Sequence, residues 1–101
     1  MFRRPFADVI RRQLDLFATE HADLLQRCED AELAYDRADR PDAEEVYGDY
    51  ADLVDEGAEW LAELRDHYAS TLSDDAAEEY EHAFNRAVLK RYRRFATRLE
   101  G

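Results

Sequence analysis

The sequence predicts an all-α fold, an antiparallel up-down-up bundle of three long helices. Apolar residues recur at alternating spacings of three and four along most of the 101 residues, a period that helices produce and strands do not. The chain also has only 3 glycines and 2 prolines, too few for the tight turns of a sandwich or barrel. Because a chain of this length builds about one hydrophobic core, we expect a single helical domain over residues 1–101.

The first helix is predicted over residues 5–38. Pro5 suits a first helical turn, where its missing N–H has no partner to lose. Pro41 disfavours helical geometry at Arg40 and therefore ends this helix. The apolar seam of this segment consists of Ile10, Leu14, Phe17, His21, Leu24, Cys28, Ala31, Tyr35 and Ala38.

The second helix is predicted over residues 42–71. Asp42 and Glu45 have the spacing of a capping box that opens it. Gly57 lies on its apolar face, where a glycine costs about 1 kcal/mol relative to alanine. We therefore expect a bulky side chain of a neighbouring helix to approach the backbone there. The face comprises Val46, Tyr50, Leu53, Val54, Gly57, Trp60, Leu61, Leu64 and Tyr68.

The third helix is predicted over residues 74–99, with Ser73 as its N-cap. Its two connections to the rest of the chain are short, so consecutive helices must run antiparallel. The expected buried face comprises Ala77, Tyr80, Phe84, Val88, Tyr92, Phe95 and Leu99.

The composition is strongly acidic, with a formal net charge of −11. Thirteen of the 14 basic residues are arginine, and Lys90 is the only lysine. In this respect the chain resembles small acidic proteins of halophilic archaea, a resemblance of composition that involves no family motif. It implies a carboxylate-rich surface that stays hydrated in molar salt. At about 1 M salt the Debye length falls to roughly 3 Å, so such a surface no longer repels itself strongly.

The charge is unevenly distributed along the chain. Residues 1–12 carry +3, residues 13–85 carry −19 and residues 86–101 carry +5. One interpretation makes the basic ends docking points for an acidic partner, including nucleic-acid phosphate bound by a stripe of Arg86, Lys90, Arg93 and Arg94. The other is that these cations complement the helix dipole and pair with acidic helices. The negative field of the whole chain argues against nucleic acid as the partner.

Long helices in a three-helix unit leave lateral apolar surface, which a homodimer would bury. We expect Trp60, Tyr47 and Leu89 on the contact surface, with Arg93 and Arg94 as an orienting rim. His21 interrupts the first apolar seam. It can set register or oligomeric state, respond to pH, or be a partly buried ring that hydrogen-bonds a neighbouring helix.

A metal site is an alternative function. Glu79 and His82 have the Glu-x-x-His spacing that places both side chains on one helical face, and Glu63 and His67 form a second pair. The first pair resembles the motif of ferritin-like di-iron carboxylate proteins, which implies a site completed by a dimer partner. In a chain with 25 acidic residues such a spacing also arises by chance.

Catalytic motifs are missing from the sequence. No glycine elbow accompanies a serine, no glycine-rich loop could hold phosphate, and the single cysteine forms no intramolecular disulfide. No apolar run has the length of a membrane span, and the first residues lack the apolar core of a signal peptide. We therefore predict a non-enzymatic, cytoplasmic protein–protein interaction or small regulatory module, with no cofactor.

Overall fold

The structure, a computed structural model, describes residues 5–100, which form helices and no strands. The predicted all-α class is therefore confirmed. The helices are α1 (Ala7–Glu20), α2 (Ala22–Arg37), α3 (Arg40–Ala69), α4 (Asp74–Arg91) and α5 (Arg93–Glu100).

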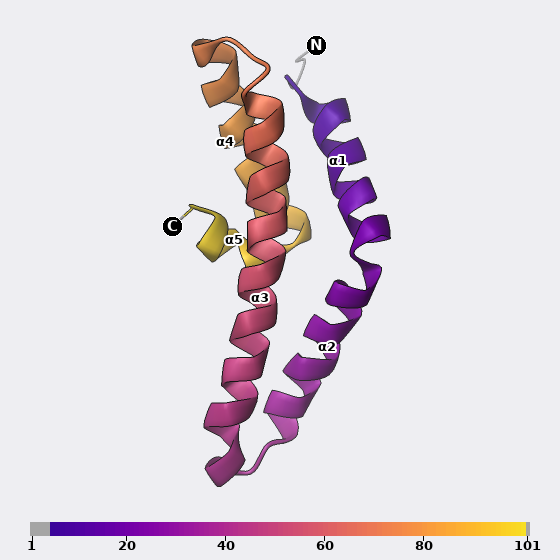
Figure 1. Ribbon diagram of the computed structural model, residues 1–101, viewed down its shortest axis with the longest axis vertical. Coiled ribbons are helices and arrows are strands. Elements are labelled where there is room, and N and C mark those ends of the chain that lie inside the picture. The colour runs from indigo at the N-terminus through magenta and orange to yellow at the C-terminus, as the bar shows by residue number, and fades with distance from the viewer. Residues whose placement is uncertain (1–4, 101) are drawn as a thin grey trace.

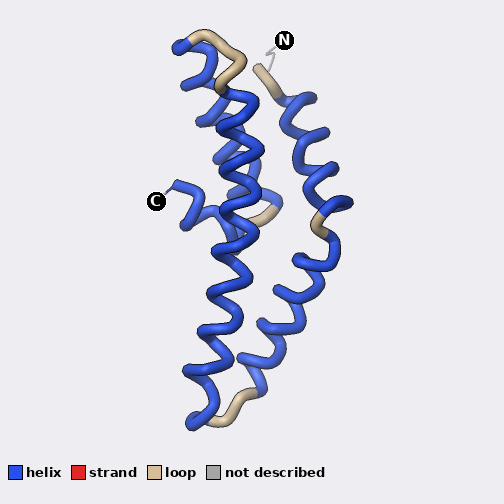
Figure 2. The backbone as a smooth tube through the Cα atoms, in the orientation of Figure 1, coloured by secondary structure: helices blue, strands red, loops and turns tan. Residues whose placement is uncertain are grey.

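The helices form an elongated body of 51 × 24 × 22 Å. Figure 1 shows α1 and α2 following one another down one side of the molecule, α3 returning along its whole length, and α4 running down beside the second half of α3. At the end of α4 the chain turns, and α5 crosses toward α3. Among the described residues, the half of the molecule farther from α4 therefore consists of α2 and the first half of α3, joined by a short loop (Figure 2).

The prediction of three continuous helices was wrong for two of the three. The segment predicted over residues 5–38 is divided at His21, and the segment predicted over residues 74–99 is divided at Tyr92. Only the middle helix is continuous, so the described residues contain five helices, and the third antiparallel rod ends halfway along the molecule.

The break at His21 places its ring between two helices. The residue has φ −118° and ψ 31°, and its ring centroid lies 5.2 Å from that of Phe17 and 4.6 Å from that of Trp60. The cost in backbone bonding is small, because the His21 N–H still donates to the Phe17 carbonyl at 2.9 Å and the Leu25 N–H to the His21 carbonyl at 3.0 Å. The bend thus gains ring contacts with α3 and keeps the helical bonds on both sides.

The break at Tyr92 folds α5 back onto the bundle. Tyr92 has φ −130° and ψ 59°, and its hydroxyl donates to the Leu14 carbonyl of α1 at 3.2 Å. Beyond it, Phe95 is 0 % and Leu99 6 % exposed. Burying side chains of this size stabilises a fold by about 1.5–3 kcal/mol each, which a straight extension of α4 into solvent would forgo.

The expectation for Gly57 is confirmed. A Cβ built at this position would overlap the ring of Phe95, so the absence of a side chain in α3 allows α5 to pack against its backbone. The buried core therefore combines all five helices. It comprises Ile10, Leu14, Phe17, Leu24, Cys28, Val54, Ala58, Leu61, Ala69, Tyr80, Phe84, Val88, Phe95, Ala96 and Leu99.

The helix starts agree with the sequence in one case and differ in the other. The Ala76 N–H donates to the Ser73 hydroxyl at 3.4 Å, so Ser73 is the N-cap of α4 as predicted. Helix α3 instead begins at Arg40, with Asp39 as N-cap and Pro41 in the first turn. Asp42 is therefore already inside the helix, because proline fits the first turn as well as it ends a preceding helix.

Within the described residues, none of the helices combines the length and the apolar character that crossing a bilayer requires.

Candidate docking surface

Six of the ten predicted site residues line one of two pockets. The first is a pocket of about 270 Å³ between α1 and α3, beside the break at His21. It brings together four residues that the sequence analysis singled out for two different reasons. Its lining consists of Leu16, Phe17, Glu20, His21, Trp60, Glu63, Leu64 and His67.

His21 acts in this pocket as a packed ring. It is half-buried, and it stacks on Trp60 with 34° between the ring planes. Trp60 itself remains 45 % exposed. Of the three alternatives for His21, these contacts correspond to a partly buried ring packed against a neighbouring helix. Its described partners are the aromatic rings of Phe17 and Trp60.

The two predicted metal pairs lie on different helices. Glu63 and His67 border the pocket on α3, whereas Glu79 and His82 are exposed on α4. Among residues 5–100, no three histidine, cysteine, aspartate or glutamate side chains are grouped closely enough to hold a metal ion. The Glu-x-x-His spacing therefore has no completing ligands among the residues that the structure describes.

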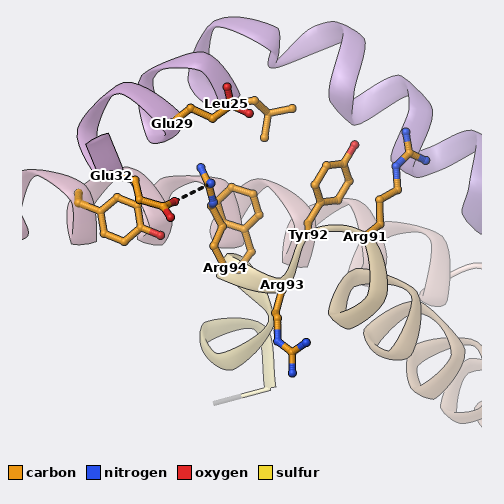
Figure 3. A pocket seen from close by; sticks show the side chains of 9 residues that line it. Leu25, Glu29, Glu32, Arg91, Tyr92, Arg93 and Arg94 are labelled. Carbon is orange, nitrogen blue, oxygen red and sulfur yellow. Dashed lines mark hydrogen bonds and ion pairs between the residues drawn. The ribbon is translucent and has the colours of Figure 1, made fainter. Parts of the chain in front are cut away.

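The second region is a pocket of about 520 Å³ beside the turn from α4 to α5. Figure 3 shows α2 on one side of it, α3 behind it, and the Tyr92 turn beneath it. Its floor is apolar and aromatic, and charged side chains form its rim. The lining consists of Leu25, Glu29, Glu32, Tyr50, Arg91, Tyr92, Arg93, Arg94 and Phe95.

The arginines of this rim point in different directions. Arg94 donates to Glu32 at 2.8 Å and lies over the Tyr50 ring at 6.0 Å. Arg91 pairs with Asp15 at 2.6 Å. Arg93 points away from α2 (Figure 3).

This arrangement divides the basic stripe that a straight helix would present. The break at Tyr92 turns Arg94 toward a carboxylate of α2 and leaves Arg86, Lys90 and Arg93 exposed. Arg94 is thus already paired with Glu32, which fits the interpretation that these cations pair with acidic helices.

Cys28 lies beneath the same region and is fully buried, at 0 % exposed. Burial raises the pKa of its thiol, and the nearby Arg94 guanidinium offsets this only in part. A thiol that stays protonated is a poor nucleophile. Cys28 is therefore a small apolar core residue.

Beyond this pocket the molecule is open along one continuous stretch. We call residues 29–53, the end of α2 and the start of α3, the arm, and residues 86–98, the end of α4 and the start of α5, the elbow. No residue of the arm is buried. Tyr35 is 42 % and Tyr47 48 % exposed, although their ring centroids lie only 5.4 Å apart.

Tyr35, in the arm, is exposed although its position in the sequence pattern predicts burial. Tyr35 continues the seam of Leu24 and Cys28, so the pattern predicts a buried ring, and the structure leaves it exposed. The sequence held one clue, the length of the first predicted helix. It is longer than the other two, so part of it has no neighbour to cover it. Tyr47, Trp60 and Leu89, which we expected on a contact surface, are exposed, Leu89 at 47 %. Tyr47 and Trp60 lie on α3, thirteen residues apart, and Leu89 lies on α4.

The arm and the elbow pocket together form one groove along α2 and α3. Figure 1 shows no third helix beside the end of α2 and the start of α3, because α4 ends at Arg91. We use the name groove for the elbow pocket together with this face of the arm, in which no residue is buried. Comparison with protein-family models, with curated proteins and with solved structures finds no match to this chain.

Proposed function

We propose that this chain is a non-enzymatic protein–protein interaction module of the cytoplasm, and that the uncovered groove of the arm is its docking surface for a helix of the partner. One observation carries the proposal. Twenty-five consecutive residues, 29–53, comprise the end of α2, the start of α3 and their connection, and contain no buried residue.

Two paired helices of this kind are incomplete as a packing unit. An amphipathic helix gains most of its stability from burying its apolar face, and a helical hairpin alone offers only one contact between helices. Tyr35, Tyr47 and Tyr50 line the open side of this hairpin. A helix laid into the groove would cover their rings and complete a bundle, a common mode of peptide recognition.

The chemistry of the groove suits binding. Tyrosine rings supply a large contact area at little cost in conformational entropy. The polar rim of Glu29, Glu32 and Arg94 surrounds them as charged residues surround the centre of other interfaces.

Site-specific photo-cross-linking tests the proposal. A benzophenone amino acid is placed at Tyr47, in the groove, or at Leu33, which is 50 % exposed on the same arm. Leu33 is two residues from Tyr35 and therefore on the opposite side of α2. We expect one discrete protein adduct from position 47 and none from position 33 after irradiation of intact cells.

The readout is the mass and identity of the adduct. Equal labelling from both positions, or no adduct from position 47, would show that the groove is not a docking surface.

A further inference from the structure

We propose that the pocket between α1 and α3 is a second binding site, and that it takes the guanidinium group of an arginine side chain of a partner protein. In this site Trp60 stacks on the guanidinium, and Glu20 and Glu63 accept hydrogen bonds from its N–H groups. The inference goes beyond the proposed function, because none of the residues that line this pocket belongs to the arm or the elbow.

The pocket contains an accessible aromatic ring. Trp60 is 45 % exposed, although burying a side chain of this size would stabilise the fold. The His21 ring lies against the indole, with 4.6 Å between the ring centroids, and so holds it in place. The rest of the indole lines the pocket. Among aromatic side chains, an indole binds cations most strongly.

The charged side chains of the pocket are carboxylates. Glu20 lies on α1 and Glu63 on α3, and the lining includes no lysine or arginine. Both glutamates are exposed, and neither takes part in an ion pair within residues 5–100. The nearest arginines along the first two helices, Arg12 and Arg27, do not line the pocket. A bound cation would therefore supply the charge that this pocket lacks.

The size and chemistry of the pocket fit an arginine side chain. Its volume is about 270 Å³, below the roughly 300–1,000 Å³ of pockets that hold whole small molecules. A guanidinium is planar, so it stacks on an aromatic ring while its N–H groups bind carboxylates at its edge. The ammonium of lysine is a compact, strongly hydrated charge and does not stack.

We assign this arginine to a polypeptide. The free amino acid carries a carboxylate, which the surface of a chain with a net charge of −11 repels. In a polypeptide this carboxylate is replaced by an uncharged amide. Tryptophan and arginine are also enriched among the side chains that dominate the binding energy of protein interfaces.

High salt favours a site of this composition. At about 1 M salt the Debye length is roughly 3 Å, so exposed carboxylates alone attract a cation only weakly. Stacking on the indole requires direct contact and depends less on long-range attraction. The pocket therefore binds a guanidinium under conditions in which the acidic surface elsewhere binds it poorly.

The first test is a titration of the whole chain in molar KCl with a short glycine–serine peptide that has one central arginine and blocked, uncharged ends. Trp60 is the only tryptophan, so its fluorescence reports on this pocket. We expect a dissociation constant of about 1–10 mM, as suits a single anchoring side chain. A mildly alkaline buffer is used, since histidines gain positive charge in acid.

Two further peptides separate arginine chemistry from positive charge. The peptide with lysine in place of arginine should bind at least about 5-fold more weakly, because it does not stack. The peptide with citrulline, which keeps the shape of arginine without its charge, should bind at least about 10-fold more weakly.

Three variants locate the site. Glu20→Gln and Glu63→Gln should each raise the dissociation constant of the arginine peptide by about 3–10-fold. Glu59→Gln is the matched control, because Glu59 is exposed beside Trp60 on α3 but does not line the pocket. It removes the same charge and should change the dissociation constant by less than about 2-fold. Circular dichroism checks that all three keep the helix content of the wild type.

Proton NMR of the peptide tests the stacking itself. Protons that lie over an aromatic ring resonate upfield, so the δ-methylene protons of the bound arginine should move upfield. Trp60→Leu, which keeps an apolar side chain, should abolish this shift, and Glu59→Gln should preserve it.

Three outcomes would overturn the proposal. Equal binding of the arginine and lysine peptides, or equal weakening by Glu59→Gln and Glu63→Gln, would show only attraction to the acidic surface as a whole. Binding of free arginine as tight as that of the blocked peptide would reject a polypeptide as the source of the guanidinium. The docking groove is tested separately, by cross-linking from position 47, so either proposal can fail while the other stands.

Discussion

The ring of Phe95 lies so close to the backbone of Gly57 that a Cβ at position 57 would overlap three of its carbon atoms. Phe95 is 0 % exposed, so a shift of the ring would disturb the packing of the core around it. This contact joins α5 to the middle of α3, and it makes the absence of a side chain at position 57 a requirement of the fold.

Gly57→Ala should therefore destabilise the protein. Alanine gains about 1 kcal/mol in helix propensity, but forcing a methyl group into a filled core costs about 1–3 kcal/mol and displaces α5 as well. We expect a net loss of up to roughly 2 kcal/mol, seen as a lower midpoint in urea unfolding.

Gly48→Ala is the matched control for that substitution. No atom lies within 4 Å of a Cβ built at Gly48, so only the propensity gain applies, about 0.5–1 kcal/mol of added stability. If both variants shift the midpoint in the same direction, close packing does not explain Gly57.

His21→Ala should loosen the contact between α1 and α3. The ring stacks on both Phe17 and Trp60, and aromatic contacts of this kind contribute about 0.5–1.5 kcal/mol each. Trp60 is the only tryptophan, so its emission maximum should move to longer wavelength as the ring becomes more exposed. His67→Ala removes an exposed histidine from the same pocket and should change neither stability nor emission; an equal response in the two variants would contradict the stacking role.

Tyr80 should make the fold sensitive to alkali. Its side chain is fully buried, and burial raises the pKa of its phenol to about 12, while its hydrogen bond to Gln13 acts in the opposite direction. In the unfolded chain the phenol ionises near its ordinary value of 10. The contribution of the neutral phenol to stability is therefore complete below pH 10 and declines as the pH rises toward 12.

The comparison with Tyr80→Phe isolates this effect. The variant should lose about 1 kcal/mol at neutral pH, because Gln13 loses its partner, but its stability should fall less between pH 9.5 and 11.5 than that of the wild type. Parallel stability profiles in the two proteins would show that Tyr80 does not dominate the alkaline response.

Salt should stabilise the protein as a whole. With a net charge of −11, self-repulsion opposes folding at low ionic strength, and screening relieves it. We expect helix content to fall as KCl is dialysed away and to recover when it is restored. Sucrose, which favours compact states without screening charge, should restore less; constant helicity without salt would argue against a salt-adapted surface.

The sequence predicted the helical class, the connections near Pro41 and Ser73, and the close approach at Gly57, because each depends on local or periodic signals. It did not predict the breaks at His21 and Tyr92. Neither break contains glycine or proline, and the apolar spacing continues through both. They arise from contacts between distant residues, such as His21 with Trp60 and Tyr92 with Leu14.

The same limit applies to the docking surface. The sequence places Tyr35 and Tyr47 on helices, but their exposure depends on α4 ending at Arg91. A seam pattern reports which residues are suited to burial, and it does not report whether a neighbouring helix extends far enough to bury them.

Phe17 touches both helix breaks, since its ring lies 5.2 Å from His21, 5.4 Å from Tyr92 and 6.1 Å from Phe95. The two bends therefore share one fully packed joint, and close-packed side chains resist independent displacement. A change in the angle of α2 would reach α5 through this ring and through the ion pair of Glu32 with Arg94. A partner helix bound against α2 and α3 would thus be expected to change the angles at both helix breaks, and with them the position of α5.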